Sequence, residues 1–263
     1  VDISVMNPLP RDFTKAEYMI RTTPHGALPT DADLFKVISK GIHGTTMPAL
    51  EEALSEEDLH KLVEYVKTFS ERFKKEGAPK PISIGSEISV TSATVEKGKE
   101  LFKKAKCFLC HGEDGSANGP ITVTLKNEWG LQFTARDLTK GWRFKVGNTL
   151  KDIYVTITTG FNGTPMGSYA DILTDEERWN LAAYVKSLST GEEGGDKVVL
   201  NPKLIQGEIP MDANAPIWQG EEPMGIELAG QMVIAPRKFT PTIDSVRIKA
   251  VYNDKEIAFL LEW

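Results

Sequence analysis

The spacing of hydrophobic positions changes along the chain from helical to alternating. Apolar residues recur every three or four positions over 59–69, 96–106 and 181–188, which predicts three amphipathic helices. Residues 246–263 instead alternate between apolar and other positions on either side of a turn, which predicts a β-hairpin. The expected fold class is therefore mainly α, with a C-terminal all-β, sandwich-like segment.

The chain also contains an internal repeat. Residues 33–70 align without a gap onto residues 152–189, at an offset of 119. Upstream, residues 12–15 match residues 137–140 at an offset of 125. The first copy therefore holds six extra residues, expected in the loop around Pro24-His25-Gly26, and the two copies are expected to be two examples of one small domain.

The repeat and the composition divide the chain into four parts. The first copy covers residues 1–74 and the second copy covers residues 95–191. Residues 75–94 contain glycine and proline but few large apolar side chains, which predicts a linker. Residues 200–263 are β-rich, and a segment of that size would be marginally stable alone.

Composition and charge narrow the classes of function. The 263 residues are 40% hydrophobic and 26% charged, which excludes wholesale disorder. The net charge of −6 does not suggest binding to nucleic acid. No apolar run reaches the roughly 18 residues that a membrane helix needs. Because the sequence begins with Val1 rather than Met, we expect a processed or cut N-terminus.

The two cysteines carry the most specific chemical information. They stand together as Cys107-Phe108-Leu109-Cys110-His111. This spacing is typical of c-type haem attachment, where two thiols add to the vinyl groups and the imidazole binds iron. A thiol–disulfide site and a structural zinc site are the alternatives. The motif follows a predicted helix rather than a strand, and zinc would need further ligands nearby, so haem is favoured.

A second axial ligand is expected downstream of the haem motif. The ligand is often a methionine thioether, whose soft sulfur favours ferrous iron. Met166 stands in a predicted loop 55 residues after His111, just before a helix that Thr174 and Glu177 would cap. We therefore expect His111 and Met166 to be the metal ligands.

Residues 90–190 resemble a class I c-type cytochrome domain, of the kind found in tandem di-haem cytochromes. The residues that carry the resemblance are Gly98-Lys99, Leu101-Phe102, Cys107, Cys110-His111-Gly112, Gly119-Pro120, Asp137-Leu138-Thr139, Gly163-Thr164-Pro165-Met166, Trp179 and Tyr184-Val185.

This resemblance implies a cofactor and a set of site residues. Cys107 and Cys110 would carry the thioether bonds to one haem c, with His111 and Met166 as axial ligands. The carbonyl of Pro120 would orient the histidine ring. Arg143, or alternatively Arg136, would contact a haem propionate.

The first copy resembles the same domain from residue 12 onward, and Met47 takes the position of Met166. No cysteine precedes Cys107, and the matching histidine would fall before Val1. Either the chain is a fragment that begins inside a haem domain, or this copy has lost its haem. We expect the former, with Met47 as a ligand of a second haem c; otherwise Met47 is an ordinary loop methionine.

Two further groups of polar residues have less specific interpretations. His25 and His60 are expected to be surface or packing residues, and His43 is a weaker candidate for haem contact. Lysines gather before the haem motif, where they would either steer an acidic redox partner or form a solvated helix face, with the second slightly favoured. They are Lys97, Lys99, Lys103, Lys104 and Lys106.

Residues 210–263 resemble the start of the β-sandwich haem b domain in the small subunit of ethylbenzene dehydrogenase and related periplasmic molybdenum enzymes. The resemblance rests on residues 210–218, 226–228 and 259–263. It implies a haem b if the domain is complete, with axial ligands beyond Trp263, and a molybdenum/iron–sulfur enzyme as partner.

The expected function is electron transfer by a periplasmic c-type cytochrome, as the haem subunit of a multi-subunit molybdenum oxidoreductase. Haem c attachment implies export from the cytoplasm. An enzyme is not expected, because both axial positions of the iron would be filled. The alternatives are a di-haem peroxidase-like enzyme, a stand-alone soluble electron shuttle, and a structural adaptor that retains haem as a relic.

Overall fold

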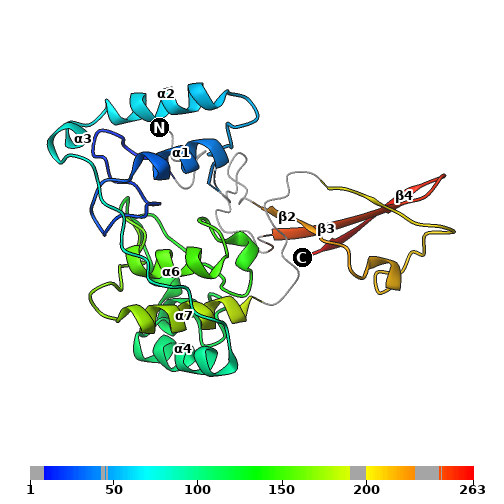
Figure 1. Ribbon diagram of the computed structural model, residues 1–263. Coiled ribbons are helices and arrows are strands. Elements are labelled where there is room, and N and C mark those ends of the chain that lie inside the picture. The colour runs from blue at the N-terminus through cyan, green and yellow to red at the C-terminus, as the bar shows by residue number, and fades with distance from the viewer. Residues whose placement is uncertain (1–8, 43–44, 46, 190–199, 229–242, 244) are drawn as a thin grey trace. The chain divides into compact units, whose positions relative to one another are not determined.

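The computed structural model describes residues 9–42, 45, 47–189, 200–228, 243 and 245–263. The described residues between 8 and 190 form one compact unit, and those from 200 onward belong to a second (Figure 1). The first unit is helical and contains both copies of the repeat, whereas the second contains a small sheet. The chain is therefore mainly α with a C-terminal β segment, as its hydrophobic pattern predicts.

The first copy contains the helices α1 (Asp31–Lys40), α2 (Glu56–Lys67) and α3 (Arg72–Lys75). Apolar side chains on the inner faces of α1 and α2 pack with residues from the preceding loop. This core consists of Ala16, Tyr18, Leu28, Leu34, Ile38, Leu59 and Val63.

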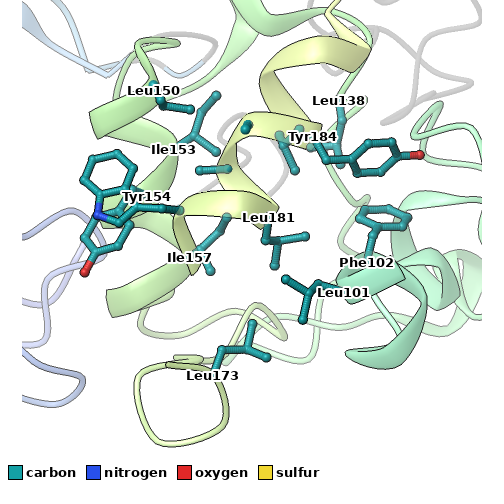
Figure 2. Packing of buried hydrophobic residues seen from close by; sticks show 14 of the residues in the cluster. Leu101, Phe102, Leu138, Leu150, Ile153, Tyr154, Ile157, Leu173, Leu181 and Tyr184 are labelled. Atoms are coloured by element: carbon teal, nitrogen blue, oxygen red, sulfur yellow. The ribbon is translucent and has the colours of Figure 1, made fainter. Parts of the chain in front are cut away.

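The second copy contains the helices α4 (Ser92–Lys104), α5 (Phe108–His111), α6 (Leu150–Thr159) and α7 (Asp175–Leu188). Two short 3-10 helices, η1 (Thr122–Thr124) and η2 (Gly141–Arg143), lie between α5 and α6. Its core is larger and is built from α4, α6 and α7 (Figure 2).

Helix α4 begins four residues before the expected start at residue 96. Thr91 is its N-cap, and the Thr91 hydroxyl accepts a hydrogen bond from the backbone N–H of Thr94 (3.2 Å). The Thr94 hydroxyl in turn accepts one from the backbone N–H of Thr91 (2.8 Å). A reciprocal cap of this kind fixes the helix start, and a threonine at the third position is a weaker sequence signal than glutamate.

Helices α4 and α7 cross at a glycine. A Cβ atom at Gly98 would collide with the backbone carbonyl of Asn180 and lie 2.6 Å from the Cβ atom of Tyr184. The missing side chain thus lets the two backbones approach closely. Next to the crossing, the rings of Phe102 and Tyr184 meet edge to face at 5.3 Å (Figure 2). This crossing holds α4 against α7, and it thereby positions the haem motif that follows α4.

The segment expected to be a linker contacts both copies. The backbone N–H of Ile82 donates to the carbonyl of Thr22 in the first copy (2.8 Å). The side chains of Ile82, Ile84 and Ile88 pack against the core of the second copy. Isolated isoleucines in a Gly- and Pro-containing stretch therefore mark anchoring points here.

The C-terminal unit contains a four-stranded sheet. Its strands are β1 (Lys203–Leu204), β2 (Met224–Glu227), β3 (Ser245–Tyr252) and β4 (Ile257–Glu262), and a 3-10 helix, η3 (Pro216–Trp218), precedes β2. Strand β3 pairs antiparallel with β2 and β4, and parallel with β1. The expected hairpin over 246–263 is confirmed, with Tyr252 opposite Ile257.

The two faces of this sheet differ in what they contact. Val251, Ala258 and Leu260 pack with Trp218 in the core of this unit. On the other set of alternating positions, the side chains of β4 are exposed: Ile257, Phe259 and Leu261. In the described part of the chain, no helix is long and apolar enough to cross a membrane.

Candidate haem site

The haem motif occupies the single turn of helix α5. Cys107 is its N-cap residue, and the Cys107 carbonyl accepts hydrogen bonds from the backbone N–H groups of Cys110 (3.2 Å) and His111 (3.0 Å). Lys106, just before the turn, has a left-handed backbone with φ of 58°. A helical turn brings positions three and four apart to one side, so the two thiols and the imidazole are grouped locally.

The ring of His111 is held by a backbone carbonyl. Its Nδ1 lies 2.8 Å from the carbonyl oxygen of Arg136. Because a carbonyl can only accept, Nδ1 must carry the proton, and the lone pair of Nε2 is left for a metal. Burial lowers the pKa of His111 from its ordinary value, although the Arg136 hydrogen bond opposes this. The neutral ring that iron binds is therefore the favoured form near neutral pH.

The carbonyl that holds His111 is not the expected one. We expected Pro120 to orient the ring, but the hydrogen bond goes to Arg136. The segment around the exposed Pro120 instead packs along the backbone of α5. The N–H of Ile121 donates to the carbonyl of Leu109 (3.1 Å), and the hydroxyl of Thr122 donates to the carbonyl of Cys110 (2.6 Å).

The Arg136 carbonyl is positioned by the turn that follows it. The carboxylate of Asp137 accepts hydrogen bonds from the backbone N–H (2.9 Å) and the hydroxyl (2.6 Å) of Thr139. The N–H of Leu138 donates to the carbonyl of Gly115, close to the haem motif (2.7 Å). A backbone acceptor leaves no signature in the residue type, so the sequence did not reveal this role.

The two cysteines are free thiols with weak acidity. Burial raises the pKa of Cys107 to about 11, despite a hydrogen bond with Tyr169, and burial also raises the pKa of Cys110. Thiol–disulfide sites depend on a lowered cysteine pKa, so this environment does not suit that alternative. Among the described residues, no cluster of three or more His, Cys, Asp or Glu side chains could hold a metal ion, which does not suit the zinc alternative.

Met166 lies in a tightly hydrogen-bonded loop after α6. Its carbonyl accepts from the N–H of Phe161 (2.9 Å), and its N–H donates to the hydroxyl of Thr164 (3.2 Å). Gly160, with φ of 64°, lets α6 end directly against the loop, where a Cβ would lie 2.5 Å from the backbone of Gly167. Met166 is half-buried. Three residues on, Tyr169 reaches Cys107, which links the end of the methionine loop to the haem motif.

The loop around Met47 has the same local structure. The Met47 carbonyl accepts from the N–H of Ile42 (3.1 Å), and its N–H donates to the hydroxyl of Thr45 (3.1 Å). Gly41, with φ of 68°, corresponds to the glycine that ends α6. The described residues of this loop therefore match the methionine loop of the second copy, although the described part of the first copy contains no cysteine. His43, the weaker candidate for haem contact, lies outside the described residues.

The remaining candidates occupy different surroundings. Arg143 is buried at the end of η2, and its contact with a propionate stays a prediction. His60 is an exposed residue that stacks on Phe35, with ring centroids 4.5 Å apart. Of the five lysines before the haem motif, Lys97 and Lys104 form ion pairs with Glu176 (3.5 Å) and Glu177 (3.3 Å) of α7. These two pairs favour a structural role for part of the lysine cluster.

The residues of the second copy fit a covalently bound haem c. Two partly buried thiols stand on one turn with a histidine whose Nε2 is left for a metal, and a loop methionine is linked to the same region through Tyr169. A thioether and an imidazole are suitable axial ligands for haem iron.

Comparisons with known proteins identify a cytochrome c domain in this part of the chain. The family model described as cytochrome c matches residues 95–189. A chain of the Kuenenia stuttgartiensis reducing HAO-like protein complex Kustc0457/Kustc0458 is 40% identical to this chain, with a TM-score of 0.66. That match covers 70% of this chain and 84% of the other. The chain therefore belongs to the c-type cytochromes, with its cytochrome c domain at residues 95–189.

Proposed function

We propose that this protein is a periplasmic electron carrier and the haem subunit of a larger oxidoreductase. The observation that carries the proposal is the hydrogen bond from His111 Nδ1 to the Arg136 carbonyl, next to two free thiols. It keeps Nε2 available and fixes the ring, as a permanent iron ligand requires. Cys107 and Cys110 would hold the haem covalently, and Met166 would be the second axial ligand.

The residues of the site suit electron transfer better than substrate chemistry. Bound haem c supplies a one-electron Fe(III)/Fe(II) couple. With His111 and Met166 as ligands no position would be open for a substrate, and the methionine loop is closed by hydrogen bonds of Met166 to Phe161 and Thr164. Electrons would enter and leave at the haem edge near the two cysteines, and Arg143 would contact a propionate.

The proposed partner is a redox enzyme in the same complex. The related Kuenenia stuttgartiensis chain comes from a complex named reducing HAO-like, which supports assembly with a redox partner. The resemblance of residues 210–263 to haem b subunits favours a molybdenum/iron–sulfur enzyme and a further haem b. Periplasmic location follows from covalent haem attachment, which takes place outside the cytoplasm.

The proposed function is tested by potentiometry and by exposure to small ligands. The isolated holoprotein is expected to show a reversible one-electron titration of the second-copy haem. It should react only slowly with CO when reduced and with peroxide, because both axial positions would be filled. Rapid reaction of the second-copy haem with either ligand would contradict the carrier and favour a peroxidase-like enzyme.

We propose in addition that the first copy serves a second haem c, with Met47 as a ligand. In the second copy, Tyr184 on α7 is covered by α4 and is 7% exposed, whereas its counterpart Tyr65 on α2 is 59% exposed. The exposed face of α2 thus fits a helix equivalent to α4, followed by a haem motif. Intact mass and a haem assay on the native polypeptide test this: two covalent haems are expected, and one would contradict it.

A further inference from the structure

The loop that carries Met166 is held by side chains of the first copy. The loop and the end of α6 span residues 159–166, and three polar contacts reach them from residues 11–21. All lie within the helical unit of the chain. They involve two arginines of the first copy, Arg11 and Arg21, and one asparagine of the loop, Asn162.

Arg21 makes the most buried of these contacts. It is 3% exposed, and its Nη2 donates to the carbonyl of Thr159 at the end of α6 (2.9 Å). Its other donors reach the carbonyls of Met19 (3.3 Å) and Pro24 (3.1 Å) in the first copy. The hydrogen bonds of this buried guanidinium are all made only while the end of α6 and the loop of the first copy both stay in place. Arg21 therefore ties the base of the methionine loop to the first copy.

Asn162 makes the reciprocal contact from the loop. Its side-chain Nδ2 donates to the carbonyl of Tyr18 (3.1 Å), and the residue is 7% exposed. Its carbonyl accepts from Nη2 of Arg11 (3.3 Å). The middle of the loop is thus fixed through both its side chain and its backbone.

Arg11 joins the loop to a neighbouring turn of the second copy. It forms an ion pair with Glu128, and its guanidinium lies over the ring of Trp129 at 5.0 Å. The N–H of Glu128 donates to the carbonyl of Gly163 (3.1 Å). Arg11 is the repeat counterpart of Arg136, whose carbonyl holds His111. In the second copy, the residue at this repeat position holds His111 through its backbone carbonyl. In the first copy, the residue at the same position holds the methionine loop of the second copy through its side chain.

We propose that Arg11, Arg21 and Asn162 are positioning residues that keep Met166 in place as an axial ligand. The proposal rests on the proposed ligation by Met166. Loss of a methionine ligand requires its loop to move, and movement would break contacts that cross from one copy to the other. The first copy thus controls how readily a competing ligand displaces the methionine of the second.

The test is a titration of the ferric holoprotein with imidazole. Binding is measured as the loss of the methionine-to-iron charge-transfer band. Arg11→Ala and Asn162→Ala are each expected to tighten apparent imidazole binding roughly threefold to tenfold, the effect of losing one or two net hydrogen bonds. Arg11→Lys, which retains the charge but not the planar fork, should fall between wild type and Arg11→Ala.

Lys36→Ala is the matched control. Lys36 also reaches across the two copies, donating to the carbonyl of Val146 (3.1 Å) near Asp152 (3.9 Å), but it does not touch the methionine loop. Its imidazole affinity should stay at the wild-type value. An equal gain in Lys36→Ala would overturn the proposal, because general loosening of the two copies would then explain the effect.

The other possible results of the imidazole titration distinguish the positioning role from Met166 ligation itself. Unchanged imidazole affinity in Arg11→Ala and Asn162→Ala, with the wild-type band present, would refute the positioning role and leave Met166 ligation intact. A wild-type protein without the band would refute Met166 ligation itself and this proposal with it. If Arg11→Ala does not retain haem, Arg11→Lys and Asn162→Ala provide the comparison.

Discussion

The two copies of the repeat share the hydrogen bonds around their methionines, and the haem motif that the structure describes lies in the second copy. Both loops close with the same hydrogen bonds around Met47 and Met166. In the described residues the two copies differ in the helix α4 and the turn α5, because α4 packs across α7 in the second copy. In both copies the methionine loop closes with hydrogen bonds between residues close in sequence, whereas the haem-attachment half depends on the crossing of two distant helices.

The largest effect is expected where that crossing is tightest. Gly98→Ala would force a Cβ into the backbone of Asn180, and we expect it to cost about 3 kcal/mol in the free energy of unfolding. Urea denaturation of the holoprotein, monitored through haem absorbance, measures this change in the free energy of unfolding. Lys99→Ala, on the exposed side of the same helix, should stay within about 0.5 kcal/mol of wild type. Equal stability of both variants would rule out the close crossing.

A pair of tyrosines at equivalent positions tests whether the copies differ in packing. Tyr184→Ala removes a buried ring that meets Phe102 and should destabilise the second copy by about 3 kcal/mol. Tyr65→Ala removes a mostly exposed ring and should cost less than about 1 kcal/mol. Hydrogen exchange along α7 and α2 reports each copy separately. A large loss of protection in α2 would show that Tyr65 is covered.

The equivalent helix caps should instead respond alike. Thr30 and Thr149 each form a capping box, with Asp33 and Asp152 respectively. Thr30→Ala and Thr149→Ala are each expected to cost about 1 kcal/mol. Thermal unfolding and helix-resolved hydrogen exchange would show the loss at the start of α1 or α6. Markedly different costs would contradict the equivalence of the two local structures.

The smallest expected effect is a dependence of the stability of α2 and α7 on pH. Hydrogen bonding to the backbone of Thr174 lowers the pKa of Glu177, and a hydrogen bond from Ser55 lowers that of Asp58. Because these folded-state pKa values lie below the unfolded ones, the stabilisation is present above the unfolded pKa and is lost as pH falls. Glu177→Gln should flatten the acid limb of the unfolding curve at α7. An unchanged limb would exclude this contribution.

The sequence allowed much of the second copy to be predicted. The spacing of Cys107, Cys110 and His111 and the position of Met166 identified the candidate ligands, and the internal repeat identified the second methionine loop. Each of these signals is a residue type at a fixed spacing, so it can be recognised in the amino-acid sequence.

The features that were missed depend on tertiary packing. The partner of His111 is a backbone carbonyl, and Arg11, Arg21 and Asn162 act between segments more than a hundred residues apart. Alternation correctly predicted strand β4 but not which of its faces would pack, since the position of Trp218 decides that. The repeat did contain one signal, because Arg11 and Arg136 occupy equivalent positions.

The central claim, that Met166 rather than an external ligand completes the iron site of the second copy, is tested most directly by potentiometry with ferric spectra. Met166→Ala is expected to abolish the methionine-to-iron charge-transfer band of the second-copy haem. It should also lower the midpoint potential by at least about 59 mV, a tenfold change for one electron. Met211→Ala, at an exposed position of the C-terminal unit, should change neither. An undiminished band and an unchanged potential of the second-copy haem in Met166→Ala would contradict the account.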